Sequence, residues 1–171
     1  MYAAGGTRRW LDLATVVVVV AIFCFLAALP RRVHDAQEAA LRYNLRSLRV
    51  AIELFKVQHD GLYPAIRTRT SQEFHDQMLR PSNRLGETAP LPTRGYTLGP
   101  YFAGELPPNP LSGARGVLVV DDADAEPPDK DSRVWVGGRT QPAGWIYSPL
   151  DGHVKPNSPG TNLDGLPWQE H

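Results

Sequence analysis

The sequence contains a single cysteine, Cys24, among its 171 residues. An intramolecular disulfide requires two cysteines and a cysteine-based zinc site requires several, so the composition excludes both within this chain. Cys24 lies in a run of apolar residues, where a thiol behaves as a small hydrophobic side chain. We therefore expect Cys24 to pack like an apolar residue.

The chain also lacks net charge, because 18 basic side chains balance 18 acidic ones. Without an overall basic field we expect no nucleic-acid partner. The balance is uneven, since residues 1–60 carry eight basic and five acidic side chains, which gives them a charge of +3 and leaves −3 for the rest. Only Pro30 and Pro64 of the 16 prolines precede residue 80. The chain thus has two halves of different composition, and its apolar content of 42% rules out wholesale disorder.

Motifs that carry enzymatic chemistry are missing as well. The sequence has no Gly-x-Ser-x-Gly motif, no P-loop and no dinucleotide-binding fingerprint. Its five histidines are scattered and lack metal-ligand spacing. His75 and Asp76 come nearest to an acid–base pair, but adjacent residues on a helix point about 100° apart. We predict that the protein is not an enzyme and has no catalytic, cofactor-binding or metal-binding residue, with calcium the one cofactor left open.

Calcium is suggested by a cluster of carboxylates between residues 121 and 131, because hard cations bind several oxygen ligands. A solvated acidic loop is the alternative interpretation. Pro127 and Pro128 interrupt the cluster and the spacing of an EF-hand is absent, so the acidic loop is favoured. The carboxylates are Asp121, Asp122, Asp124, Glu126, Asp129 and Asp131.

A long apolar segment is present near the N-terminus. Residues 13–29 read LATVVVVVAIFCFLAAL, in which Thr15 is the most polar side chain. At about 1.5 Å per residue such a helix spans about 26 Å, near the lower bound for crossing the hydrocarbon core of a bilayer. We predict a transmembrane helix over residues 10–30, preceded by a short segment, residues 1–9. The anchor positions are Leu13, Val16, Val20, Phe23, Leu26 and Leu29.

A cleaved secretory signal is the alternative interpretation of this segment, because such signals also place basic residues before an apolar run. A cut after Ala28 would put Leu26 at a position that requires a small residue, so a retained anchor is favoured. Arginines lie on both sides of the segment, at residues 8, 9, 31 and 32. The positive-inside rule alone therefore leaves the orientation open.

An amphipathic pattern follows directly, over residues 31–61. Apolar residues recur at alternating steps of four and three, which places them on one face of a helix. Pro30 is expected to bend the helix without ending it, and Asp60-Gly61 to end it. The packing face of a small domain is the favoured interpretation, and a dimeric coiled coil is the alternative. The apolar residues are Leu41, Leu45, Leu48, Ile52 and Phe55.

The remaining residues, 62–171, predict a head domain with a short helix and a small sheet. Thr70 and Glu73 have capping-box spacing for a helix over residues 71–80, and residues 81–115 form a long ordered connection. Extended runs occur at residues 117–120, 134–136 and 145–147. Asp151-Gly152 predicts a hairpin between the last run and residues 153–155. The fold class is α+β, with a long N-terminal helix packed on a small C-terminal antiparallel sheet.

The order of these features resembles the type IV pilin-like proteins, particularly the major pseudopilins of type II secretion, over most of the chain. Residues 20–30 resemble the hydrophobic pilin segment with its bend-making proline. Residues 41–49 and 52–64 resemble the family's helix end, followed by Gly, an aromatic residue and Pro. Residues 98–101, 106–113, 144–147 and 151–152 resemble its loop and final hairpin.

The resemblance implies a structural subunit of a type II secretion or type IV pilus-like filament, which serves protein secretion by assembly. It implies a single-pass protein of the inner membrane, with a cytoplasmic N-terminus and a periplasmic head. Its partners would be that membrane, other pilin-like subunits and components of the secretion machine. Major pseudopilins also often bind calcium in a C-terminal loop, where this chain offers Asn162 and Asp164, but we assign no ligand.

The sequence departs from the family at the processing site. Family members open with Gly-Phe-Thr-Leu-Ile-Glu and are cut after the Gly, whereas here Trp10 stands at the Gly position and Thr15 at the Glu position. Asp12 is the nearby acid that could replace the Glu and pair with a neighbouring subunit, since a carboxylate in a bilayer needs a partner. Solvation of Asp12 beside Arg8 and Arg9 is the favoured interpretation. The alternative function is a membrane-tethered accessory or binding domain that is neither processed nor assembled.

Overall fold

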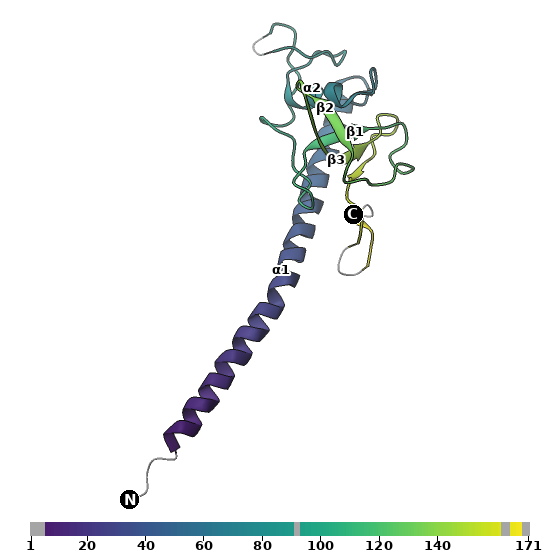
Figure 1. Ribbon diagram of the computed structural model, residues 1–171. Helices are drawn as coiled ribbons and strands as arrows, with labels where there is room; N and C mark the ends of the chain where they lie inside the picture. The colour runs from purple at the N-terminus through teal and green to yellow at the C-terminus, as the bar shows by residue number, and fades with distance from the viewer. Residues whose placement is uncertain (1–5, 91–92, 162–164, 169–171) are drawn as a thin grey trace, which may run out of the picture. The chain divides into compact units, whose positions relative to one another are not determined.

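The computed structural model describes residues 6–90, 93–161 and 165–168, and within the first helix it describes the side chains of residues 18, 19 and 33–58. The chain forms two compact units, Met1–Ala36 and Gln37–His171. The second unit contains all the described elements except the first part of helix α1 (Figure 1).

Helix α1, Gly6–Gln58, begins four residues before the predicted start and continues through Pro30, as predicted. Over the described residues, no helix is both long and apolar enough to cross a membrane. The side chains of Asp12 and of the six anchor positions lie outside the described residues. The anchor and the assembly acid therefore stay predictions. The anchor positions in question are Leu13, Val16, Val20, Phe23, Leu26 and Leu29.

In the second unit, one face of α1 is buried. The five apolar residues that predicted this face form the inner stripe, and each is at most 1% exposed. Burial of a side chain of this size contributes about 1.5–3 kcal/mol relative to exposure. The inner stripe is therefore the packing face of the domain, and the coiled-coil interpretation of these residues is wrong. The inner stripe consists of Leu41, Leu45, Leu48, Ile52 and Phe55.

The end of α1 lies two residues before the predicted Asp60-Gly61 stop. Asp60 and Gly61 have φ angles of 55° and 87°, and the N–H of Gly61 donates to the Lys56 carbonyl at 2.9 Å. Positive φ values turn the backbone out of the helix while its last carbonyls stay bonded. The sequence signal thus marks the cap, and the helix ends just before it.

Helix α2, Ser71–Leu79, was predicted from its N-cap. The Thr70 hydroxyl accepts a hydrogen bond from the Glu73 N–H at 3.2 Å. The Glu73 carboxylate does not complete the box on Thr70, because it accepts from the N–H and hydroxyl of Thr68, at 2.8 and 2.7 Å. The start of α2 is therefore held by two contacts: Thr70 caps the Glu73 N–H, and the Glu73 carboxylate binds Thr68, two residues before the N-cap.

The sheet is mixed, which corrects the predicted antiparallel arrangement. Strand β3, Arg139–Tyr147, pairs antiparallel with β2, Arg133–Val136, and with β4, Val154–Pro156, but parallel with β1, Gly116–Val119. The chain reverses direction between β1 and β2 and again at Gly137-Gly138, so β3 runs the same way as β1. The predicted hairpin through Asp151-Gly152 is confirmed as the β3–β4 pair.

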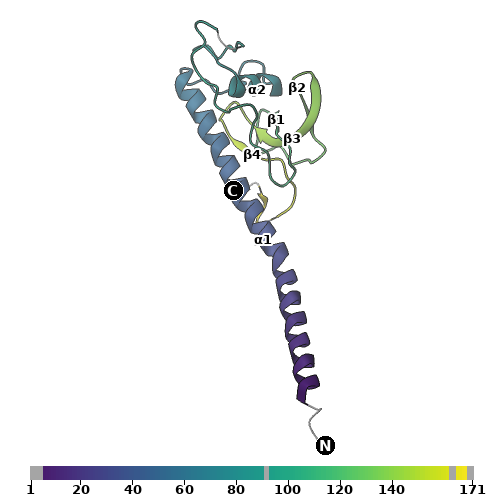
Figure 2. The same ribbon diagram turned by 90° about the vertical axis from the view of Figure 1, so that its left-hand side faces the viewer.

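The core lies between the sheet, α2 and the inner stripe of α1. Figure 2 shows α2 and the sheet on one side of the C-terminal part of α1. Trp145 and Tyr147 of β3, Phe74 of α2 and Val154 of β4 join the inner stripe in one buried cluster. The predicted packing of the long helix on the sheet is thus present on this side of α1.

Candidate functional site

The side of α1 that faces away from the core carries a second apolar stripe. Its large side chains are exposed, with Tyr43 at 71%, Val50 at 59%, Leu54 at 46% and Val57 at 77%. Together with Ser47 they follow the same steps of four and three as the inner stripe, shifted by two residues. Two residues correspond to about 200° around a helix, so the two stripes lie on nearly opposite faces. We call Tyr43, Ser47, Val50, Leu54 and Val57 the outer stripe.

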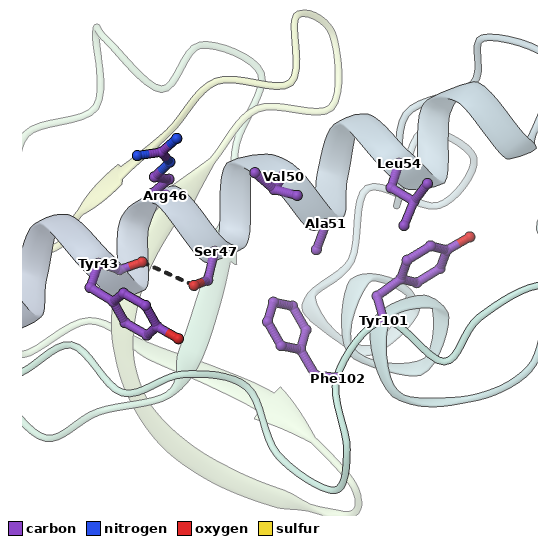
Figure 3. Close-up of a pocket in the computed structure, with 8 residues that line it drawn as sticks. All are labelled: Tyr43, Arg46, Ser47, Val50, Ala51, Leu54, Tyr101 and Phe102. Atoms are coloured by element: carbon purple, nitrogen blue, oxygen red, sulfur yellow. Dashed lines mark hydrogen bonds between the residues drawn. The ribbon is translucent and has the colours of Figure 1, made fainter.

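An apolar groove of about 390 Å³ runs beside the outer stripe. Tyr43, Val50 and Leu54 line it from α1, while Tyr101 and Phe102 line it from the connection between α2 and β1 (Figure 3). In Figure 3 the rings of Tyr101 and Phe102 point toward the helix, with Tyr101 next to Leu54. The groove is thus formed between one helix face and a two-residue aromatic wall.

Hydrogen bonds hold this aromatic wall in place. The N–H groups of Tyr101 and Phe102 both donate to the Met78 carbonyl, at 2.9 and 3.1 Å, and the Tyr101 hydroxyl donates to Gln58 Oε1 at 2.6 Å. Burial raises the pKa of Tyr101 to about 12, which keeps the phenol protonated and able to donate. The groove is therefore preformed, and a partner would bind it without first ordering the wall.

Polar groups contribute little to the groove. The Ser47 hydroxyl donates to the Tyr43 carbonyl at 3.0 Å, so its hydrogen bond is made within the helix. Arg46 lines the rim and forms no ion pair with any residue that the structure describes. The groove carries no nucleophile paired with a base, and its chemistry is that of a surface that buries apolar side chains.

The acidic cluster between residues 121 and 131 makes turns. Asp122 Oδ1 accepts from the N–H groups of Asp124 and Ala125, at 2.9 and 3.1 Å. Asp129 Oδ1 accepts from the Asp131 N–H at 2.9 Å. Within the described part of the chain, which excludes Asn162 and Asp164, no three His, Cys, Asp or Glu side chains are placed to hold a metal ion. The carboxylates of Asp122 and Asp129 thus cap turns of the loop.

Further hydrogen bonds tie this loop to the sheet. Asn157, which directly follows β4, accepts from the Asp129 N–H at 2.7 Å and donates to the Asp129 carbonyl at 2.8 Å. Arg69 pairs with Asp121 at 2.6 Å. The loop is therefore fastened at both of its ends.

His75 and Asp76, the nearest approach to an acid–base pair in the sequence, are not hydrogen-bonded to each other, whereas His153 Nδ1 lies 3.0 Å from Asp124 Oδ1 on the exposed acidic loop. The distance from His75 Nδ1 to Asp76 Oδ1 is 3.9 Å.

His59 is fully buried, stacks on Phe55 with ring centroids 3.7 Å apart, and hydrogen-bonds through both ring nitrogens, to the Phe55 carbonyl at 2.7 Å and to Ser82 Oγ at 2.9 Å. Burial lowers its pKa. His59 is thus a structural residue of the core.

The outer stripe is not among the residues predicted from the sequence. Its signal was available, because the outer stripe repeats the spacing of the inner one, but Ser47 interrupts it and arginines flank it. The aromatic wall had no local signal, since Tyr101 and Phe102 are separated from the helix by more than forty residues.

Comparison of the chain with protein-family models, curated proteins and solved structures finds no match.

Proposed function

We propose that the protein is a membrane-anchored, pseudopilin-like structural subunit that assembles through the outer stripe of α1. The observation that carries the proposal is the row of exposed apolar side chains at Tyr43, Val50, Leu54 and Val57, beside a preformed groove. An exposed apolar patch on a small domain marks an interaction surface. The spacing of four and three is the one that helices use to pack against other helices.

The size of the contact favours assembly of many anchored copies over a dimer in solution. Each large side chain of the outer stripe would contribute about 1.5–3 kcal/mol if fully buried. Association costs about 4–15 kcal/mol in lost freedom of motion, so one such contact is marginal. Confinement of the subunits in a membrane, and repetition of the contact along a filament, both reduce this cost per contact.

The anchor in this proposal is the apolar segment of residues 13–29. The resemblance to pseudopilins implies a single-pass protein of the inner membrane, with the N-terminus in the cytoplasm and the head, residues 62–171, in the periplasm. The partners are then the membrane, other pilin-like subunits and components of a secretion or pilus machine. We favour a type II secretion machine, because the sequence resembles the major pseudopilins of that system.

Substitution of Leu54 tests the assembly surface. Leu54→Lys places a charge on the outer stripe and is expected to abolish crosslinked oligomers of the full chain in native membranes. Leu150, which is 53% exposed in the β3–β4 turn, provides a matched control. Leu150→Lys should leave the oligomers unchanged. Oligomers that persist in Leu54→Lys, or that disappear equally in both variants, contradict the proposal.

The accessory-domain function is kept as a second proposal because Trp10 and Thr15 stand where the family has its processing Gly and its Glu. Mass spectrometry of the N-terminus from native membranes separates the two. A methylated N-terminus near residue 10 supports the filament subunit and contradicts the accessory domain. An N-terminus at Met1, or one residue later, supports the accessory domain.

A further inference from the structure

A small polar cavity lies on the head and shares no lining residue with the groove. Its volume is about 200 Å³, and its polar lining consists of His75 from α2, Glu105 and Arg115 from the connection before β1, and Arg139 and Gln141 from β3. These residues come from three elements that are well separated in the chain. The cavity is therefore a product of the tertiary fold.

The charges that line the cavity are mainly positive. Arg115 and Arg139 oppose the single carboxylate of Glu105, and His75 is neutral near pH 7 because burial and the charges of Arg80 and Arg139 lower its pKa, against the opposing effect of Asp76. Arg115 is already fixed, with Nε 3.1 Å from Glu105 Oε2 and Nη1 donating to the Leu106 carbonyl at 2.7 Å. An oriented guanidinium is prepared to bind an oxyanion without losing further side-chain entropy.

One charged side chain at the cavity, Arg139, has unused hydrogen-bonding capacity. Arg139 forms no ion pair or side-chain hydrogen bond within the part of the chain that the structure describes. His75 Nδ1 has almost no accessible surface and lies 3.9 Å from Asp76 Oδ1, and neither atom has a hydrogen-bond partner among the described residues. This nitrogen therefore does not bind a ligand in the cavity directly. An anion beside Arg139 would instead raise the proton affinity of the imidazole, because a nearby negative charge favours the imidazolium.

We propose that this cavity binds a small oxyanion, of the carboxylate or phosphate class, between Arg115, Arg139 and His75, with Gln141 as an additional hydrogen-bond donor. The guanidinium groups present paired N–H donors that match both carboxylate and phosphate oxygens. Glu105 orients Arg115 and excludes a second negative charge from its side of the cavity. The site is independent of the outer stripe, because none of its residues lies on α1.

The test uses the full chain in non-ionic detergent micelles. Inorganic phosphate and malonate are titrated separately, against sodium chloride at equal ionic strength, while the histidine Cε1–H signals are followed by NMR. We expect saturable binding of at least one of the two anions at one site per chain. A bound anion should raise the pKa of His75, since a nearby negative charge favours the imidazolium. Phosphate binding alone identifies a phosphate site, and malonate binding alone a carboxylate site.

Variants decide whether any binding belongs to the cavity. Arg139→Gln should weaken binding at least tenfold. In the unliganded chain it should raise the pKa of His75, because the charge of Arg139 lowers it, and leave the signals of the other histidines unchanged. Arg139→Lys keeps the charge without the planar fork and should lie between. Arg94→Gln removes the same charge from an exposed loop outside the cavity and should bind like the wild type. Absence of saturable binding, or equal weakening by Arg139→Gln and Arg94→Gln, overturns the proposal.

Discussion

On α1, the inner stripe from Leu41 to Phe55 and the outer stripe from Tyr43 to Val57 follow the same alternation of four and three residues. The inner residues are at most 1% exposed, whereas the large outer ones are between 46% and 77% exposed. Similar spacing therefore leads to opposite environments. The two faces differ in what packs against them: residues of the sheet and α2 join the inner stripe in the core, whereas the outer stripe borders a groove walled by Tyr101 and Phe102.

The inner stripe of α1 stabilises the fold, whereas the outer stripe is the interaction surface that we propose. An apolar side chain that is already buried stabilises the folded subunit, and its loss should be measured as a lower free energy of unfolding. An exposed apolar side chain contributes little to that free energy. Under the proposed assembly through the outer stripe, the loss of such a side chain weakens contacts between subunits instead. Substitutions on the two faces can therefore be compared directly.

Truncation of the inner stripe should have the largest effect on stability. Leu45→Ala removes a side chain that is 1% exposed and leaves a cavity against the sheet, which costs about 2–5 kcal/mol. Urea unfolding of the full chain in detergent, followed by the fluorescence of buried Trp145, measures this loss. A change below about 1 kcal/mol would contradict the role of the inner stripe as the packing face.

The hairpin that covers the inner stripe should be almost as sensitive. Gly152 has a φ of +80°, and a Cβ at this position would overlap the ring of Tyr63. Gly152→Ala should destabilise the domain by about 2–4 kcal/mol, from backbone strain together with overpacking. Gly138→Ala is the control, because its φ of +78° imposes similar strain while no atom lies within 4 Å of the new Cβ. Equal losses in the two variants would exclude the contact with Tyr63 as the cause.

The sequence-based predictions are confirmed for those parts of the fold that a local pattern determines. Leu41, Leu45 and Leu48 follow the helical period and are buried, and Asp151-Gly152 predicts the β3–β4 hairpin. The predictions missed the first half of β3, because Pro142 and Gly144 have low strand propensity and the strand there is held by pairing with β2. Because the first half of β3 was not predicted, its pairing with β2, and with it the parallel β1–β3 pair, was not predicted either.

The groove and the polar cavity could not be predicted in the same way. Tyr101 and Phe102 reach α1 only because their N–H groups are bonded to Met78 of α2. Likewise, Arg115 and Arg139 meet at one cavity through the pairing of β1 and β2 with β3. Such sites depend on contacts between distant segments, for which a single sequence carries no periodic signal.

A titratable residue occupies the next position of the inner stripe, four residues after Phe55. His59 is fully buried and neutral, and burial lowers its pKa below the ordinary value of 6.5. The unfolded chain then binds a proton more readily than the folded one, so stability should be complete above pH 6.5 and fall as the pH drops below it. The slope is at most about 1.4 kcal/mol per pH unit for one group.

Urea unfolding at several pH values between 5 and 8 measures the effect of His59. In His59→Gln the slope below pH 6.5 should be reduced, and the remainder is attributed to His75, whose pKa is lowered as well. A slope that is unchanged in His59→Gln would show that another group is responsible. His59→Gln will also lower stability at all pH values, so the comparison is made between slopes.

The smallest effect on stability is expected on the outer stripe. Val57 is 77% exposed, and Val57→Ser should change the free energy of unfolding by less than about 0.5 kcal/mol. The same substitution at Val154, which is 1% exposed, should cost about 2–4 kcal/mol, because it removes buried methyl groups and buries a hydroxyl. Under our proposal Val57→Ser nevertheless weakens crosslinking between subunits in membranes, while Val154→Ser affects assembly only as far as it unfolds the subunit. A stability loss in Val57→Ser comparable to that in Val154→Ser would show that the outer stripe is part of the fold, and the contrast between the two faces of α1 would no longer hold.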